Sequence, residues 1–321
     1  MKTVPAEVQP EKAGPERAGG SGGRHPPASK FLARLELVGS GMAFGLMAVL
    51  ARRLSRGGAG FTAGHLSVIR FVVGALVSLL VFRLRPGTYR PRNYRLLVSR
   101  GLSGGAVVVL YFWALARIPA AEAGMIYNLF PVIAVGMSVF TFGERPTVHL
   151  LAGLAAATLG VGLVLGNGSL SLGLGLGEGA ALAAAVFAAA SANVIRGMRG
   201  TDNAATIFFW FCLAGLPVVA PFALGRWPSD PGAWAEAVAM GLSAFAAQLL
   251  MTEAYGALSV PEAAAWLQLT PITQALLAWP LLGERASAAS LVGVTVGVAG
   301  VAWATVLGQR RPAPVPGDPP P

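Results

Sequence analysis

Two ionisable side chains lie within long apolar stretches of the sequence. Arg70 is flanked by LSVI and FVVGALVSLLVF, and Glu253 lies within AAQLLMTEAYGAL. A charge at the centre of a bilayer costs roughly 2.5–3.5 kcal/mol on insertion scales, so such residues face protein or water and mark ion paths, gates or proton relays. Arg70 and Glu253 are therefore candidates for gating or coupling. The structural alternatives are an ion pair for Arg70 and a solvated, interfacial carboxylate for Glu253, which lies close to the end of its stretch.

Aromatic and amide side chains form a second set of candidates in the apolar stretches. They are Trp113, Tyr127, Asn128, Gln248, Trp266 and Gln268. Rings stack on a ligand and amides hydrogen-bond to it without burying a net charge, which suits a zwitterionic or heterocyclic small molecule. Polar side chains also join membrane helices to each other, at ~0.6 kcal/mol each. Ligand binding and helix association both stay open for these six residues.

The elements that must position these residues are long apolar runs. The chain is 55% hydrophobic and 12% charged, with a mean hydropathy of +0.63, whereas a soluble domain has roughly 25% charged residues. Ten runs approach the roughly 20 residues that a helix needs to cross ~30 Å of hydrocarbon. They are 32–54, 61–83, 96–116, 120–141, 147–165, 174–195, 204–224, 234–255, 261–282 and 287–307. Because backbone groups in lipid must be satisfied within the segment, we predict an all-α membrane protein with ten transmembrane helices.

The basic residues indicate how the chain is oriented. The net charge is +10 and the isoelectric point is about 10.8, but many of the arginines lie in short loops such as RLRPGTYRPRNYR (83–95). Arginine collects on the cytoplasmic side of membrane proteins, so this pattern favours a membrane orientation over nucleic-acid binding. We expect a multi-pass protein of the cell (inner) membrane with both termini cytoplasmic. Arg52, Arg53 and Arg56 would lie on the other side, against the rule.

One block of the sequence occurs twice. FPVIAVGMSVFTFGER (130–145) and TPITQALLAWPLLGER (270–285) both place Gly-Glu-Arg 12 positions after a proline, at an offset of 140 (283 minus 143). The same offset pairs Glu122 with Glu262 and Asn128 with Gln268. Each copy holds five of the predicted spans, and since five is odd, the second copy would be inverted relative to the first. Inverted repeats around a midplane site are a transporter design.

These features together resemble the EamA-type branch of the drug/metabolite transporter superfamily. The resemblance rests on the ten spans, the two five-helix copies, the Arg70-Phe71 pair and the proline-then-Gly-Glu ends of spans four and nine, and it covers about 33–165 and 174–307. It implies a cavity between spans one, three, four, six, eight and nine that closes alternately at either face. The predicted organisation is a disordered tail (1–30), a first repeat (31–166), a loop (167–173), a second repeat (174–308) and a Pro-rich tail (309–321).

The function predicted from the sequence is that of a secondary transporter that exports a small amphipathic metabolite, an amino acid or related compound, by alternating access. Export of drug-like or nucleobase-like heterocycles is the alternative, and a membrane-embedded lipid-modifying enzyme is the alternative from another class. The sequence has no His/Asp pair or carboxylate cluster at a membrane face that would support the enzyme alternative. Without a phosphate-binding loop or metal-ligand spacing among the three histidines, we predict no cofactor and no metal. Expected partners are the small-molecule substrate, the lipid bilayer and, if transport is coupled, protons. G-x-x-x-G pairs are compatible with a homodimer, but packing within the chain explains them more simply.

Overall fold

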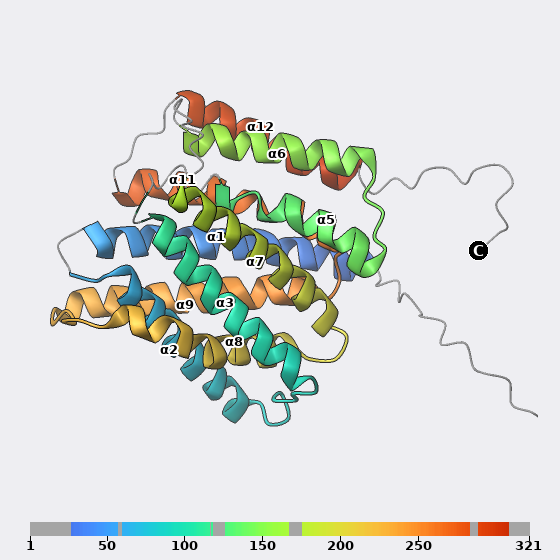
Figure 1. Cartoon of the computed structure of the whole chain (residues 1–321). Helices are drawn as coiled ribbons and strands as arrows, with labels where there is room; N and C mark the ends of the chain where they lie inside the picture. The colour runs from blue at the N-terminus through green and yellow to red at the C-terminus, as the bar shows by residue number, and fades with distance from the viewer. Residues whose placement is uncertain are drawn as a thin grey trace, which may run out of the picture.

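The computed structural model describes residues 27–56, 60–115, 117, 126–166, 175–282 and 288–307. Within these ranges every regular element is helical, as Figure 1 shows. The first part of the chain forms α1 (Pro27–Arg56), α2 (Ala63–Leu84), α3 (Tyr94–Leu115), α5 (Phe130–Phe142) and α6 (Val148–Gly166). The second part forms α7 (Leu176–Met198), α8 (Ala204–Val219), η1 (Ala220–Ala223), α9 (Pro231–Ala254), α10 (Val260–Leu267), α11 (Leu269–Leu282) and α12 (Ala288–Val306). The all-helical prediction is therefore confirmed for the described residues.

Helix is found in each of the ten predicted runs. Among the described residues, five helical segments are long and apolar enough to cross a membrane, namely Ser29–Ser55, Ala63–Leu84, Leu176–Met198, Ala204–Ala223 and Pro231–Ala254. Shorter apolar helices occupy Phe130–Phe142, Val148–Leu163 and Leu291–Ala304. The predicted tails outside 27–307, the predicted loop 167–173, Glu122 and the second Gly-Glu-Arg triplet lie outside the described residues.

Polar caps determine where several helices begin. Thr62 and His65 form a capping box at the start of α2, in which each side chain binds the other residue's backbone N–H. The Asn203 side chain accepts from the Thr206 N–H at the start of α8, and the Asp230 carboxylate accepts from two N–H groups at the start of α9. These caps accept hydrogen bonds from the first N–H groups of each helix, which no helical carbonyl reaches, so the helices begin at these residues.

Spans four and nine are interrupted at equivalent positions. In span four the chain turns at Asn128 and Leu129 before α5 begins, and in span nine Gln268 separates α10 from α11. The two breaks coincide at the offset of 140 and each comes three residues before a proline, Pro131 or Pro271. Proline has no N–H for the carbonyl four residues earlier, which weakens the helix at that point. Broken helices at membrane depth are tolerated where they line a cavity or are buried in protein.

Equivalent helices of the two halves make equivalent contacts. α1 packs on α9 and α11, while its counterpart α7 packs on α3 and α5. Likewise α2 packs on α9, and its counterpart α8 packs on α3. The pairs α2 with α8 and α6 with α12 each join one helix to its own counterpart. The main contacts of one half therefore correspond to those of the other when the halves are exchanged, which indicates a two-fold relation between them.

Helices α6 and α12 pack closely through glycines. A Cβ atom on Gly153 would lie 2.6 Å from the Gly300 carbonyl oxygen, and one on Gly160 would lie 2.6 Å from the Gly293 carbonyl oxygen. Since the earlier glycine of one helix meets the later glycine of the other, the two counterparts run antiparallel. They form a separate layer at the edge of the bundle (Figure 1).

Candidate functional site

Aromatic side chains from α3 and span four gather next to the break in span four. The ring centroids of Tyr111 and Tyr127 are 4.8 Å apart, and those of Tyr127 and Phe130 are 5.4 Å apart. Trp113 packs with Tyr111 on the alanines of α7. The Arg117 guanidinium lies 3.5 Å from the centroid of the Trp113 ring. The structure thus brings the candidates Trp113 and Tyr127 into one aromatic wall, with Asn128 adjacent in sequence at the break.

Amide and indole groups of α9 and span nine form a second group. Gln268 is 0% exposed and its Nε2 donates to Thr158 Oγ1 at 2.7 Å, but its Oε1 has no partner among the described residues. Gln248 is 5% exposed, and its Nε2 also has no described partner. The same holds for Nε1 of Trp266, which packs against the cluster around Leu37 and Tyr255. An unpaired buried polar group costs ~1–3 kcal/mol, so these atoms are placed to bind a ligand or water.

Arg70 lies on α2, in the part of the molecule that also holds Phe44 and Cys212. Its Nε is buried with no hydrogen-bond partner among the described residues, and its guanidinium lies 5.9 Å from the Phe44 ring centroid. Tyr127 and Cys212 are near enough to act on it electrostatically. No ion pair in the described part of the chain neutralises it. The structure therefore brings Arg70 near the candidate Tyr127.

Glu253 lies apart from these residues, at the end of α9. Its Oε2 accepts from Arg199 Nη2 at 2.6 Å, and its side chain is 43% exposed. Arg196 Nη1 donates to the Tyr255 carbonyl at 3.0 Å in the following turn. The structure does not bring Glu253 together with Arg70. The carboxylate instead ties the end of α9 to the end of α7.

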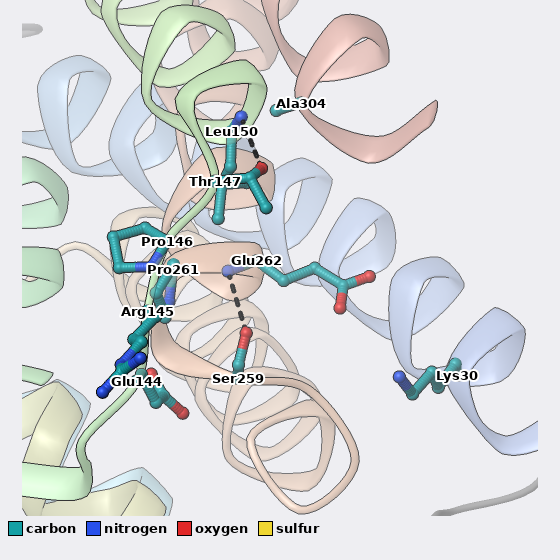
Figure 2. A pocket seen from close by; sticks show the side chains of 10 residues that line it. All are labelled: Lys30, Glu144, Arg145, Pro146, Thr147, Leu150, Ser259, Pro261, Glu262 and Ala304. Carbon is teal, nitrogen blue, oxygen red and sulfur yellow. Dashed lines mark hydrogen bonds between the residues drawn. The ribbon is translucent and has the colours of Figure 1, made fainter. Parts of the chain in front are cut away.

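A cavity of about 320 Å³ opens at this same end of the bundle (Figure 2). It is lined by Lys30, Glu144, Arg145, Pro146, Thr147, Leu150, Ser259, Pro261, Glu262 and Ala304. The lining comes from both halves, since residues of the α5–α6 loop face the start of α10 across it, as Figure 2 shows. Two cations and two carboxylates make its charge balanced. It is suited to a polar or zwitterionic solute, or to closing by ion pairs.

Both carboxylates of this cavity have structural partners. Glu262 is 8% exposed and accepts from Arg34 Nη2 at 2.8 Å, which ties α10 to α1. Glu144 Oε2 accepts from the Val260 N–H at 3.2 Å, which ties the α5–α6 loop to α10. Burial raises the pKa of the Glu144 carboxyl, and hydrogen bonds from Ser138 and Val260 and the charge of Arg196 offset this in part.

Sequence reasoning missed two features of the site. Arg100 is not among the candidates that the sequence indicates, but it is 5% exposed on α3 and lies 4.4 Å from the Phe211 ring centroid. Glu262 lies in the first turn of α10, and no local pattern in the sequence pairs it with Arg34. The available signal for Arg100 was its place between an arginine-rich loop and the apolar run GLSGGAVVVL.

The duplicated helical fold, with unpaired polar atoms in its interior, defines a multi-pass membrane protein of the transporter class. The model of the EamA-like transporter family matches residues 33–166 and 175–306, one match in each half. The chain therefore belongs to the EamA-like transporter family. The family resemblance seen in the sequence is confirmed.

Two curated relatives and one solved structure are similar to this chain. The pseudopaline exporter CntI of Pseudomonas aeruginosa is 24% identical over 69% of this chain and 80% of its own length. The probable terminal-alkyne amino-acid exporter of Streptantibioticus cattleyicolor is 28% identical over 80% of this chain and 90% of its own length. A protein of known crystal structure aligns with a TM-score of 0.73 at 24% identity, over 87% of this chain and 99% of that one, and supports the fold.

Proposed function

We propose that the protein is a secondary transporter of the inner membrane that exports a small amphipathic metabolite, an amino acid or related compound, by alternating access. Two five-span repeats, 31–166 and 174–308, would be inverted relative to each other, with both termini in the cytoplasm. Both curated relatives carry names of exporters, and one name specifies an amino acid. These names support the direction of transport and the class of substrate.

The observation that carries this proposal is the contact pattern of the two halves. Counterpart helices α6 and α12 run antiparallel, and the contacts of α1 and α7 correspond when the halves are exchanged. In such a protein, exchanging the conformations of the two halves exchanges the side to which the midplane site opens. The breaks at Asn128 and Gln268 supply equivalent points at which spans four and nine can bend.

The proposed roles of the interior residues follow from their surroundings. Trp113, Tyr127, Asn128, Gln248, Trp266 and Gln268 would line the substrate site, with aromatic and amide groups contributed by both repeats. Arg70 would bind or gate there because its charge has no described counterion. Glu253 would act at the cytoplasmic end, where its ion pair with Arg199 can open and reform as that face opens and closes.

Transport by the purified protein in liposomes is the direct test. Vesicles preloaded in turn with unlabelled amino acids, nucleosides or amines are given the same labelled compound outside, and counterflow is measured. We expect uptake of label for at least one amino acid or amino-acid derivative, and none into protein-free vesicles. Absence of exchange for all three classes, together with a chemical change in the lipid, would show that the chain is an enzyme.

Coupling to protons has its own test in the same vesicles. Glu253→Gln removes the ionisable group but keeps a hydrogen-bond acceptor for Arg199. If Glu253 carries the coupling proton, the variant exchanges substrate but no longer responds to an imposed pH gradient. A variant that responds to the gradient as the unmodified protein does would remove Glu253 from the coupling mechanism.

A further inference from the structure

We infer that Arg70 and Arg100 together form an anion site within the membrane, and that the transported metabolite carries two carboxylates that neutralise them. This inference rests on the proposed function and narrows its substrate class. Arg100 is not among the residues that the sequence analysis selected, and Arg70 was selected only as a gating or coupling residue.

The two arginines come from neighbouring parts of the first half. Arg70 lies on α2 and Arg100 on α3, and both helices pack on α8. Phe211 of α8 supports the Arg100 guanidinium at 4.4 Å, and the next residue, Cys212, acts on both cations. Gly74, one turn beyond Arg70, faces the same stretch of α8, because a Cβ atom there would lie 2.7 Å from Cys212 Sγ, and the ring centroids of Phe71 and Phe211 are 4.9 Å apart. Both helices therefore meet α8 at Phe211 and Cys212, and we assign the two arginines to one site there.

A glycine makes room for the second arginine. A Cβ atom on Gly104, one turn beyond Arg100 on α3, would lie 2.5 Å from Arg100 Nη1 and close to the Phe211 ring. The guanidinium therefore lies alongside its own helix, next to both the glycine and the ring. Packing against both restricts the movement of the planar group, which favours bidentate binding of a carboxylate.

Neither arginine has a counterion among the described residues. The Nε atoms of both are buried without a hydrogen-bond partner there. The described titratable groups that act on Arg100 besides Arg70 are Tyr127, Cys212 and Tyr255, none of which is an acid at neutral pH. By contrast, Arg34 and Arg199 near the bundle end are paired with carboxylates. Charges inside a membrane protein are normally paired or serve function, so a bound anion is the missing partner.

The charge balance indicates the substrate class. A simple zwitterion has one carboxylate and leaves one of the two arginines without a counterion. A metabolite with two carboxylates, such as an acidic amino acid or a derivative of one, provides one carboxylate for each arginine, and any ammonium group on it is left for an acceptor oxygen such as Gln268 Oε1. The Tyr127 hydroxyl, which lies within electrostatic range of both arginines, can donate a further hydrogen bond. The amide of Gln248 is left for neutral parts of the molecule.

Matched acid and amide probes test this inference directly. Binding of L-glutamate and L-glutamine, and of L-aspartate and L-asparagine, is measured by thermal shift on the purified full chain in detergent. The acid of at least one pair should bind at least about tenfold more tightly than its amide, because charge-assisted bonds to two guanidinium groups are lost in the amide. In Arg70→Gln and Arg100→Gln the preference should fall to within about twofold, while Arg70→Lys should restore part of it. Amides that bind as well as the acids, or a preference unchanged in both glutamine variants, would overturn the inference.

Two controls separate a ligand site from a structural ion pair. Arg53→Gln removes an exposed arginine paired with Glu236, so it should leave the acid preference intact. Glu122→Gln tests an acid that lies outside the described residues. If Glu122 were the counterion, Glu122→Gln would lower the melting temperature and Arg70→Gln would do the same without ligand. We expect the opposite, since Arg70→Gln relieves repulsion in the ligand-free protein and should melt no lower than the unmodified protein.

The counterflow measurement separates this inference from the proposed function. If the vesicles exchange neutral amino acids but no dicarboxylate, the transport function is supported and the anion site is rejected. If the vesicles exchange nothing while glutamate still binds in an arginine-dependent way, the anion site is supported and export is rejected.

Discussion

Replacing a residue whose buried polar atom has no described partner should affect transport more than folding. Gln268 is the clearest case, because its Oε1 has no partner among the described residues while its Nε2 binds Thr158. We expect Gln268→Ala to raise the substrate concentration for half-maximal exchange about tenfold and to change the melting temperature little, since one neutral hydrogen bond contributes only about 1 kcal/mol. Thr295→Ala is the matched control, because Thr295 Oγ1 bonds to the Leu291 carbonyl of its own exposed helix face. Equal kinetics for the two variants would remove Gln268 from the site.

At the bundle end, Glu144 should give stability a specific pH dependence. Burial raises its pKa above the ordinary value of 4.5, so the folded protein binds this proton more tightly than the unfolded chain. Its contribution to stability is therefore gained as the pH falls through the raised pKa, and is lost again as the pH rises through it. Melting temperatures of the unmodified protein and Glu144→Gln should be compared from pH 4.5 to 8. The melting temperature of the unmodified protein, relative to that of the variant, should rise toward low pH. A difference that is constant or that changes in the opposite direction would contradict the raised pKa of Glu144.

The residues show which parts of the site were predictable. Arg70 and Glu253 stood out in the sequence because a charge in an apolar run is costly. Arg100 did not, because it adjoins a loop rich in arginine and only the packing on Phe211 and Gly104 reveals its burial. The partner of Glu253 is Arg199, 54 residues away, and no local pattern pairs them. Side-chain pairing depends on which helices meet, and that was not available from the sequence.

At the scale of elements, the pairing of α6 with α12 should depend on its glycines. A Cβ atom on Gly160 would lie 2.6 Å from the Gly293 carbonyl oxygen, which forces two backbones apart. We expect Gly160→Ala to lower stability by ~1–3 kcal/mol, seen as a lower melting temperature in detergent. Gly179→Ala in α7 is the control, because a Cβ there meets no described atom within 4 Å and alanine favours the helix. If both variants melt alike, close backbone packing does not hold this pair.

The helices themselves were predicted well because hydropathy and length determine membrane spans. The breaks in spans four and nine do not follow from hydropathy. The duplicated block points to Pro131 and Pro271, and the interruptions fall three residues earlier, at Asn128 and Gln268. The proline removes the hydrogen bond to the carbonyl four residues back, so the disturbance lies on its N-terminal side. Because the breaks lie before the prolines, Asn128 and Gln268 are at the breaks themselves, where their amides can reach the freed backbone or a ligand.

At the scale of the whole molecule, the two-fold relation explains why the repeat could be found in the sequence. Gly153 and Gly160 align with Gly293 and Gly300 at the offset of 140, and in the structure Gly153 meets Gly300 while Gly160 meets Gly293. Residues on the axis of a two-fold must satisfy both halves at once, which keeps the copies alike there. Glu253 and its equivalent, Trp113, lie off the axis and differ. Residues that match between the two copies therefore indicate the shared scaffold. Residues that differ indicate where the two halves have different roles.

The proposed inversion of the halves would place equivalent loops on opposite sides of the membrane. The start of α2 lies near the start of α9, where His65 stacks on Trp227, and the end of α7 lies near the end of α9, where Arg199 binds Glu253. Figure 1 shows these two places at opposite ends of the bundle. Ala63 and Thr201 are both exposed and follow the first helix of their respective halves.

Single cysteines at these positions test the arrangement. Cys212 is the chain's one cysteine and is buried, so Cys212→Ala supplies the background for Ala63→Cys and Thr201→Cys. In intact bacterial cells an impermeant thiol reagent should label Ala63→Cys, because one predicted span separates it from a cytoplasmic N-terminus. It should label Thr201→Cys only after the membrane is opened, because six predicted spans return the chain to the cytoplasmic side, where Arg196 and Arg199 also favour it. The cysteine-free background must remain unlabelled throughout. Labelling of both variants from the same side would mean that the halves are parallel, and a parallel pair could not exchange roles to move the site from one compartment to the other.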